Sequence, residues 1–372
     1  MERHHIAALC LLLLVAVICA VAGWEFLAMH QPDEIIPGPG VTKTERLSAY
    51  FPPLAGTGAD TKVYILDSGR PGATALVLGG THPNEPAGFM TAVVITEHIV
   101  AREGKLIVIP QVCSSGFTCT DPLEGYPQFY SIQSKTKLRR FRFGSRGSNP
   151  IAEWPDPLVF LQYPSGQQLS GNEVRNLNRS YPGRPDGTIS ERTAYAVMQL
   201  IEREKVDLAF DLHEAAPEIP IINAIVTHEK GKDVAASALF TLEGENLQCA
   251  LEMSPPNFRG LSHREWGDHS SVYPFLMETS NPIQGRLRGG TDTALILQGI
   301  DQKYFQAAQL GTMRITYDLS GEPLARRVGR HLRGLQALFG AFMESSPEKR
   351  IVVDNVPSYE EIVQQGLGNY LN

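Results

Sequence analysis

The segment GGTHPNEPAG at residues 79–88 holds the residue types best suited to chemistry. His82 and Glu85 follow directly on an expected strand and precede an expected helix. In an open α/β sheet, ligands bind at the carboxyl ends of strands. The segment DLHEA at 211–215 places His213 at the end of a second expected strand. Two imidazoles and one carboxylate are the ligand set of catalytic zinc, which keeps a fourth position open for water. The sequence therefore predicts a site for one Zn²⁺ ion held by these three side chains.

Two carboxylates next to His213 have different expected roles. Asp211 lies two residues earlier in the chain, and therefore on the same face of the strand, where it can orient a metal ligand. Glu214 is a rival ligand, but the next position on a strand points to the opposite face. We therefore expect Glu214 to point away from the site.

Strand-like and helix-like segments alternate along the chain. Expected strands cover 63–66, 75–78, 106–110, 206–212 and 275–277, and expected helices cover 86–102, 191–205 and 323–343. This alternation is typical of an α/β fold, here a doubly wound mixed sheet with helices on both faces. Such a sheet brings the carboxyl ends of distant strands to one edge.

The N-terminus carries an export signal. Residues 6–23 form an uncharged apolar run preceded by a short polar segment with Arg3. The length of the run does not separate a cleaved signal peptide from a membrane anchor over 1–23. The small-x-small pattern at 20–22 favours cleavage. We expect a periplasmic or extracellular protein, with an N-terminal membrane tether as the alternative.

The rest of the chain divides into one large domain and its attachments. We expect a Pro- and Gly-rich linker over 24–60, a zinc-binding domain over 61–346 with an irregular insertion over the site at 113–172, and a C-terminal tail over 347–372. In an exported protein disulfide bonds persist, and the sequence leaves open whether Cys113 and Cys119 pair.

Composition excludes several classes of protein. The net charge of -7 argues against a nucleic-acid partner. The sequence contains neither a Gly-x-Ser-x-Gly elbow nor a Walker loop, which argues against a serine hydrolase of that type and a nucleotide-binding enzyme. The basic cluster at 137–146 is either a solvated loop or a source of arginines for the site.

Four motifs, in this order, resemble the zinc carboxypeptidase superfamily. They are GGTHPNEPAG, NLNRSYPG at 176–183, DLHEA and a later strand ending in Glu278. The resemblance covers about residues 60–300 and is greatest to the branch of succinylglutamate desuccinylase and aspartoacylase. It implies that His82, Glu85 and His213 bind zinc.

The resemblance also implies roles for other residues. Asn178 and Arg179 correspond to the pair that grips a substrate carboxylate, and a guanidinium offers the planar fork for that interaction. Glu278 corresponds to the general base and acid, at a strand end near a zinc-bound water. Glu252, which also follows a strand-like run, is a competitor for this role.

An arginine that stabilises the developing oxyanion is harder to assign. At the spacing of the aspartoacylase branch the matching position is Gly171, so the correspondence fails. Arg175, which we also expect to bind substrate, and Arg140, Arg142 or Arg146 from the insertion are the alternatives.

Two more histidines, His263 and His269, lie close together in GLSHREWGDHSS. The sequence leaves three roles open for them: they line the pocket, bind a second metal ion, or only make polar packing contacts.

We therefore expect a zinc-dependent hydrolase of an amide bond in a small carboxylate-bearing N-acyl amino acid or peptide. The deacylase branch usually adds a β-rich C-terminal domain, whereas the residues after Glu278 look helical. An exported metallocarboxypeptidase acting on short or cell-wall peptides is therefore an alternative. A catalytically degenerate, metal-dependent binding protein is a third.

Overall fold

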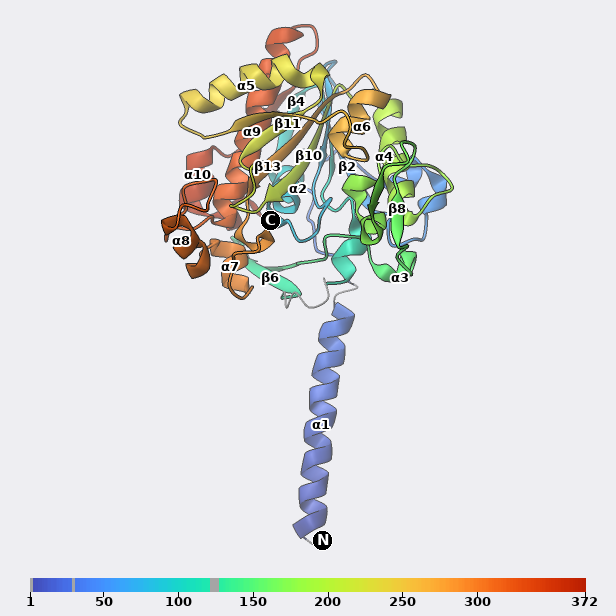
Figure 1. Cartoon of the computed structure of the whole chain (residues 1–372), viewed down its shortest axis with the longest axis vertical. Helices are drawn as coiled ribbons and strands as arrows, with labels where there is room; N and C mark the ends of the chain where they lie inside the picture. Colours follow the sequence, from blue (N-terminus) through green and yellow to red (C-terminus); the bar gives the residue numbers. More distant parts are fainter. Residues whose placement is uncertain (1–2, 29–30, 121–126) are drawn as a thin grey trace.

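The computed structural model describes residues 3–28, 31–120 and 127–372. Helix α1 (Arg3–Ala28) extends away from the body that the other elements form (Figure 1). Its 26 residues are exposed on all sides, and it is the one helix in the described ranges that is long and apolar enough to cross a membrane. A helix of this length spans about 39 Å, more than the roughly 30 Å hydrocarbon core of a bilayer.

An eight-stranded mixed sheet forms the centre of the body. In spatial order its strands are β1 (Lys43–Arg46), β2 (Lys62–Asp67), β5 (Lys105–Ile109), β3 (Thr74–Leu78), β10 (Leu208–Ala215), β13 (Tyr273–Ser280), β11 (Ala224–Thr227) and β12 (Ala250–Met253). The central strands β5, β3, β10 and β13 are parallel to one another, and β1, β2 and β11 run antiparallel to their inner neighbours. The prediction of an α/β mixed sheet is confirmed.

Helices cover both faces of the sheet (Figure 1). One face packs against α2 (Pro86–His98), α5 (Lys232–Gly244), α9 (Leu324–Ser345) and α10 (Tyr359–Gln365), and the other against α4 (Ile189–Arg203) and α6 (Ser262–His269). Because side chains alternate along a strand, Val77 of β3 lies in the first core and Leu78 in the second. Short helices α7 (Thr293–Gln298) and α8 (Gln302–Gln309) precede α9.

Two segments that we expected outside the domain are built into it. Within the expected linker, β1 adds an edge strand to the sheet, and Leu47 and Leu54 after it are buried. Within the expected tail, β14 (Val352–Asp354) pairs with β4 (Val100–Glu103), and Ile362 of the short helix α10 is buried. The folded body therefore extends beyond residues 61–346 at both ends.

The insertion over 113–172 contains two hairpins, β6 (Phe129–Gln133) with β7 (Leu138–Arg142) and β8 (Val159–Leu161) with β9 (Gln168–Ser170). The short helix α3 (Pro150–Glu153) lies between them in the chain. Part of the insertion, 121–126, lies outside the described residues. Within the described ranges no disulfide bond is formed, and Cys113 is buried.

Candidate metal centre

The three side chains expected to share a metal meet at the carboxyl edge of the sheet. His82 and Glu85 lie in the turn after β3, and His213 lies in β10. The Nδ1 atom of His82 is 2.8 Å from Oε1 of Glu85, and Nδ1 of His213 is 2.9 Å from Oε2 of the same carboxylate. All three residues are buried, and their ligand atoms lie within 4.8 Å of one another.

The donor set fits a divalent metal such as zinc. The outer Nε2 of His82 is 2.9 Å from Oδ1 of Asn176, and Nε2 of His213 is 3.0 Å from Oδ2 of Asp211. An oxygen lies near each Nε2, as a hydrogen-bond acceptor for His82 and as a close negative charge for His213, so a proton is favoured on each Nε2 and the Nδ1 atoms point inward. The two Nδ1 atoms are only 3.2 Å apart. At this distance a positive charge, either a proton on one of the two nitrogens or a metal ion shared by both, has to lie between them.

Electrostatics at the centre also favour a cation. Burial works against a charge on His213, but the carboxylates of Asp211 and Glu85 outweigh it and raise the pKa of His213 well above its usual range. Burial, together with the Arg146 charge, lowers the pKa of His82 to about 4. The surroundings of the cluster therefore attract positive charge while the His82 ring stays neutral.

Strand alternation separates the carboxylates on β10 as predicted. Asp211 and His213 share one face, and the prediction that Glu214 points away is confirmed. Its carboxylate accepts hydrogen bonds on the other side of the sheet, from the Ala87 N–H at 2.8 Å and the Arg327 guanidinium at 2.6 Å. Glu214 and Arg327 form a fully buried ion pair.

Close packing of α2 on β10 sets the position of the Glu85 turn. A Cβ atom on Gly88 would lie 2.2 Å from the carbonyl oxygen of Leu212, so only glycine allows this approach. The backbone N–H of Glu214 donates to Oε2 of Glu85 at 3.1 Å. The first turn of α2 and the end of β10 are therefore in direct contact at the centre.

Glu278 lies beside the three ligands. The parallel register of β10 and β13 pairs His213 with Glu278, so their side chains point to the same face of the sheet. Oε2 of Glu278 is buried without a hydrogen-bond partner within the described part of the chain. Burial raises the pKa of Glu278 to about 8, with His213 opposing and Glu85 adding to the effect. The competitor Glu252 lies on β12, two strands away from β13.

The residues expected to bind substrate separate into two groups. Arg179 is mostly buried, with 15% of its side chain exposed, and its guanidinium lies 4.8 Å from the centre of the Phe258 ring. Burial lowers the pKa of Arg179, and the negative charges of Glu173, Glu85 and Glu278 act against this effect. Arg179 therefore stands within the field of the site carboxylates.

Asn178 and Arg175 make mainly structural contacts. Oδ1 of Asn178 accepts the backbone N–H of Ser262 at 2.8 Å. The guanidinium of Arg175 binds both oxygens of Asp156, at 2.8 and 3.1 Å. None of these three contacts is with His82, Glu85 or His213.

Among the arginines left open by the sequence, the structure brings Arg146 to the ligands. Its Nη1 lies 3.0 Å from Oε1 of Glu85 and 3.3 Å from Nδ1 of His82. Arg142 is instead buried against Asp33. The Arg140 guanidinium lies over the Phe129 ring and 3.8 Å from Glu25.

Helix α6 supports the site through its first residue. Ser262 donates its hydroxyl to Oδ2 of Asp211 at 2.5 Å, and Thr81 donates to Oδ1 of the same carboxylate at 2.6 Å. Asn176, Thr81 and Ser262 were missed by the sequence analysis. Each of them lies in a segment quoted above: Thr81 in GGTHPNEPAG, Asn176 in NLNRSYPG and Ser262 in GLSHREWGDHSS.

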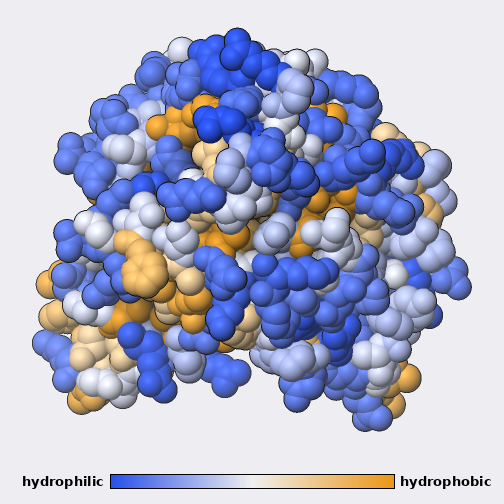
Figure 2. All heavy atoms as spheres, turned by 90° about the horizontal axis from the view of Figure 1, so that it is seen from above, coloured by the Kyte–Doolittle hydropathy of each residue, from blue (hydrophilic) through white to orange (hydrophobic). Residues whose placement is uncertain are grey.

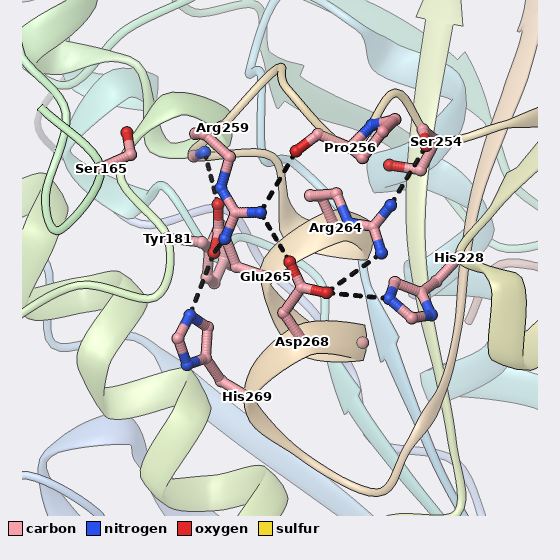
Figure 3. Close-up of polar contacts among 12 residues, drawn as sticks. Ser165, Tyr181, His228, Ser254, Pro256, Arg259, Arg264, Glu265, Asp268 and His269 are labelled. Atoms are coloured by element: carbon pink, nitrogen blue, oxygen red, sulfur yellow. Dashed lines mark hydrogen bonds and ion pairs between the residues drawn. The ribbon is translucent and has the colours of Figure 1, made fainter. Parts of the chain in front are cut away.

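An ion-pair network holds the loop before α6 against the helix (Figure 3). Arg259 pairs with Glu265 at 2.7 Å and with Asp268 at 2.6 Å, and Asp268 also binds Arg264 and His228. This loop carries Phe258, so the network holds the aromatic ring over Arg179.

The two additional histidines occupy different environments. His269 pairs with Glu265 at 3.2 Å on the outer side of α6. His263 is buried, neither ring nitrogen has a hydrogen-bond partner within the described ranges, and burial lowers its pKa to about 3. The cluster of possible metal ligands found among the described residues includes neither of them.

Comparisons with known proteins return similarity in structure only. No protein-family model matches the sequence, and no curated protein matches it. The structure is similar to the product-bound ectoine utilization protein EutE (DoeB) from Ruegeria pomeroyi, with 19% identity, a TM-score of 0.39 and coverage of 61% of this chain and 55% of that one. It is also similar to a succinylglutamate desuccinylase from Silicibacter sp. TM1040, with 16% identity, a TM-score of 0.39 and coverage of 61% and 55%.

A metallo-carboxypeptidase from Burkholderia cenocepacia shows 12% identity and a TM-score of 0.47, with coverage of 87% of this chain and 68% of that one. This chain spans about half the length of the EutE and succinylglutamate desuccinylase structures. The similar structures include both a desuccinylase and a metallo-carboxypeptidase. Because all three TM-scores are below 0.5, the function is inferred from the geometry of the site.

Proposed function

We propose that this chain is a zinc-dependent hydrolase that cleaves an amide bond in a small carboxylate-bearing N-acyl amino acid or peptide. The observation that carries the proposal is the convergence of His82, Glu85 and His213, with two inward Nδ1 atoms 3.2 Å apart, beside an unpartnered carboxylate oxygen of Glu278. This arrangement combines a site for a Lewis-acid ion with an adjacent group that can exchange a proton.

The site residues have distinct proposed roles. When bound by the three ligands, a zinc ion polarises a water molecule and the substrate carbonyl. The charge of a metal ion beside Glu278 would favour its ionised form, which can accept a proton from the attacking water and donate it to the leaving nitrogen. Arg146, which already reaches Glu85, stabilises negative charge that develops on the carbonyl oxygen.

Arg179 is the proposed partner of the substrate carboxylate. Its guanidinium is held in place by a 2.6 Å hydrogen bond to the Asn178 carbonyl oxygen and by the Phe258 ring. A planar, nearly buried guanidinium gives a strong bidentate interaction with a carboxylate. Substrates that carry this group are therefore favoured.

One observation supports a metallocarboxypeptidase as the second candidate. The described chain directly after β13 is largely helical, with α7, α8, α9, α10 and the short strand β14, whereas the deacylase branch usually has β-rich structure after its catalytic domain. Release of free C-terminal residues from peptides supports this candidate, whereas release of an acid from acyl amino acids supports the deacylase.

We also propose that α1 anchors the protein in a membrane, with the body on the exported side. The helix is continuous through 20–22, where cleavage was favoured from the sequence. Arg3 lies at its start, which is consistent with a cytoplasmic N-terminus. Trp24 and Phe26 lie near its other end, as aromatic residues do at a membrane interface.

The test of the hydrolase compares Glu278→Gln with wild type for bound metal and for amide hydrolysis. The substrates are a panel of N-acyl amino acids and short peptides. We expect zinc to be retained and turnover to fall by about 10² to 10⁴, because the proton acceptor is lost. Glu252→Gln is the matched control and keeps full turnover. Unchanged turnover in Glu278→Gln removes Glu278 from its role, and wild type that binds no metal contradicts the proposal as a whole.

A further inference from the structure

The insertion exposes a group of large apolar side chains that the proposed hydrolysis does not use. They are Ile151 (90% exposed), Trp154 (71%), Leu158 (99%), Val159 (48%), Leu161 (58%) and Tyr163 (43%). We call this group the apolar face. It lies within 13 consecutive residues that include α3 and β8. Large apolar side chains exposed this close together in the chain indicate an interaction site.

The apolar face begins at the end of the body from which α1 emerges. Figure 1 places α3 and β6 at that end and α5 at the opposite one. On the face seen from the opposite end, hydrophilic residues predominate (Figure 2). Helix α3 of the insertion is therefore on the side of the proposed membrane helix, and β8 lies farther up the same flank of the body (Figure 1).

The connection from α1 to the body is short and firmly docked. Asp33 pairs with Arg142 at 2.9 Å, and both side chains are almost completely buried. The N–H of Ile36 donates to Glu97 at 3.0 Å, so the chain remains attached to the body beyond Asp33. The five residue steps from Ala28 to Asp33 span at most about 17 Å when fully extended. If α1 crosses a bilayer, the body must lie at its surface.

Basic residues on the β6–β7 hairpin accompany the apolar face. Lys135, Lys137 and Arg140 are exposed, and Leu138 between them is 65% exposed. Arg139, by contrast, is buried and pairs with Glu97 at 2.6 Å. Lys137 pairs with Glu34 at 2.7 Å, and Arg140 lies 3.8 Å from Glu25 of α1. The basic cluster therefore fixes the hairpin through Arg139 and places its exposed positive charges beside the acids at the α1 end.

We propose that the apolar face rests on the lipid bilayer that α1 spans, with the exposed basic side chains of the hairpin at anionic headgroups. This inference rests on the proposed membrane anchor. Tryptophan, tyrosine and aliphatic side chains next to basic residues have the composition of a membrane interface. Arg146, which reaches the metal centre, lies in the same insertion between β7 and α3, so the insertion connects the apolar face to the centre along the chain.

Tryptophan fluorescence tests the proposal in the full chain. The three tryptophans are Trp24 in α1, Trp154 on the apolar face and Trp266, which is completely buried. Trp24→Phe leaves Trp154 as the reporter of the face, and Trp154→Phe leaves Trp24 as the reporter of the anchor. Each variant is placed in nanodiscs of phosphatidylcholine and phosphatidylglycerol, with brominated or unbrominated acyl chains.

We expect the brominated lipid to remove most of the Trp154 emission in Trp24→Phe and to leave the emission of the double variant, which reports Trp266, nearly unchanged. Adding Ile151→Glu and Leu158→Glu to Trp24→Phe relieves the quenching. Adding Phe240→Glu, a change at a 75% exposed position on α5 at the far end, does not.

Two other outcomes overturn the proposal in distinguishable ways. If Trp24 is quenched and Trp154 is not, the anchor stands but the face is not on the bilayer, and a second copy or another protein covers it. If neither is quenched, the anchor itself is wrong.

Discussion

His213 and Glu278 are register partners on the adjacent parallel strands β10 and β13. Neighbouring strands are about 4.8 Å apart, so the separation of a proposed metal ligand and the proposed base is set by backbone hydrogen bonds. Neither residue depends on a loop for its position. This rigidity is what a site needs if a proton is to be transferred next to a bound ion.

Asp211→Asn is expected to weaken zinc binding. The Asp211 carboxylate lies 3.0 Å from Nε2 of His213 and favours the proton on that nitrogen. An amide carries no charge, so we expect affinity to fall by about 10- to 100-fold. Competition with a zinc chelator measures the change. Asp207→Asn, just before the same strand, is the control; equal affinity in both variants contradicts the role of Asp211.

Arg146→Gln is expected to lower turnover by about 10² while the metal remains bound, because a donor to the developing oxyanion is lost. Steady-state kinetics and metal analysis of the same preparation measure both quantities. Arg140→Gln serves as the control, since that side chain contacts Phe129 and Glu25 instead. An Arg146→Gln enzyme with normal turnover would exclude Arg146 from the reaction.

Arg327→Met is expected to lower the free energy of unfolding by about 3 to 5 kcal/mol, because it leaves the Glu214 carboxylate buried without its cation. Arg333→Met removes a partly exposed pair with Glu245 and should cost less than about 1 kcal/mol. Denaturant unfolding of both variants gives the comparison. An equal decrease in the free energy of unfolding in both variants would show that the buried pair stabilises the fold no more than the exposed pair does.

The network on α6 predicts a pH dependence of stability. Burial opposes the charge on Asp268, but His228 and Arg259 outweigh it and hold the pKa at about 2, below the ordinary 3.8. A depressed pKa stabilises the fold above the ordinary value, and this contribution disappears as the pH falls from about 4 to about 2.

Asp268→Asn should therefore lose about 1 to 2 kcal/mol at pH 7, a value reduced for partial exposure of the side chain, and match wild type near pH 2. Unfolding by denaturant at several pH values measures the difference. The exposed Asp186→Asn is the control. A constant difference across this range would rule out ionisation of Asp268 as the cause.

Periodicity and turn chemistry predicted the elements that carry the site. The His82 turn follows a strand of five buried residues, and α2 begins at Pro86 as expected. The edge strand β1 was not predictable in the same way, because KTER has no apolar alternation and is defined only by its pairing with β2. Charged residues on an edge strand also limit unwanted pairing.

The supporting residues of the site depend on tertiary contacts that the sequence does not encode locally. Asn176 is 94 residues from His82, and Ser262 is 51 residues from Asp211. Arg146 was one of several arginines in a segment without periodicity, so only the folded path of the insertion could distinguish it. The clustering of His82, Glu85 and His213 was thus predictable by residue type and position, and the partners of these residues were not.

The contact between Gly88 and Leu212 couples architecture to chemistry. A single methyl group at residue 88 would push the first turn of α2 away from β10, and the carboxylate of Glu85 would move with it. The geometry offered to an ion is therefore adjusted by the same interface that stabilises the core. Substitutions in α2 that aim to change the metal preference of the site must therefore keep glycine at residue 88, because its contact with Leu212 leaves no room for a side chain.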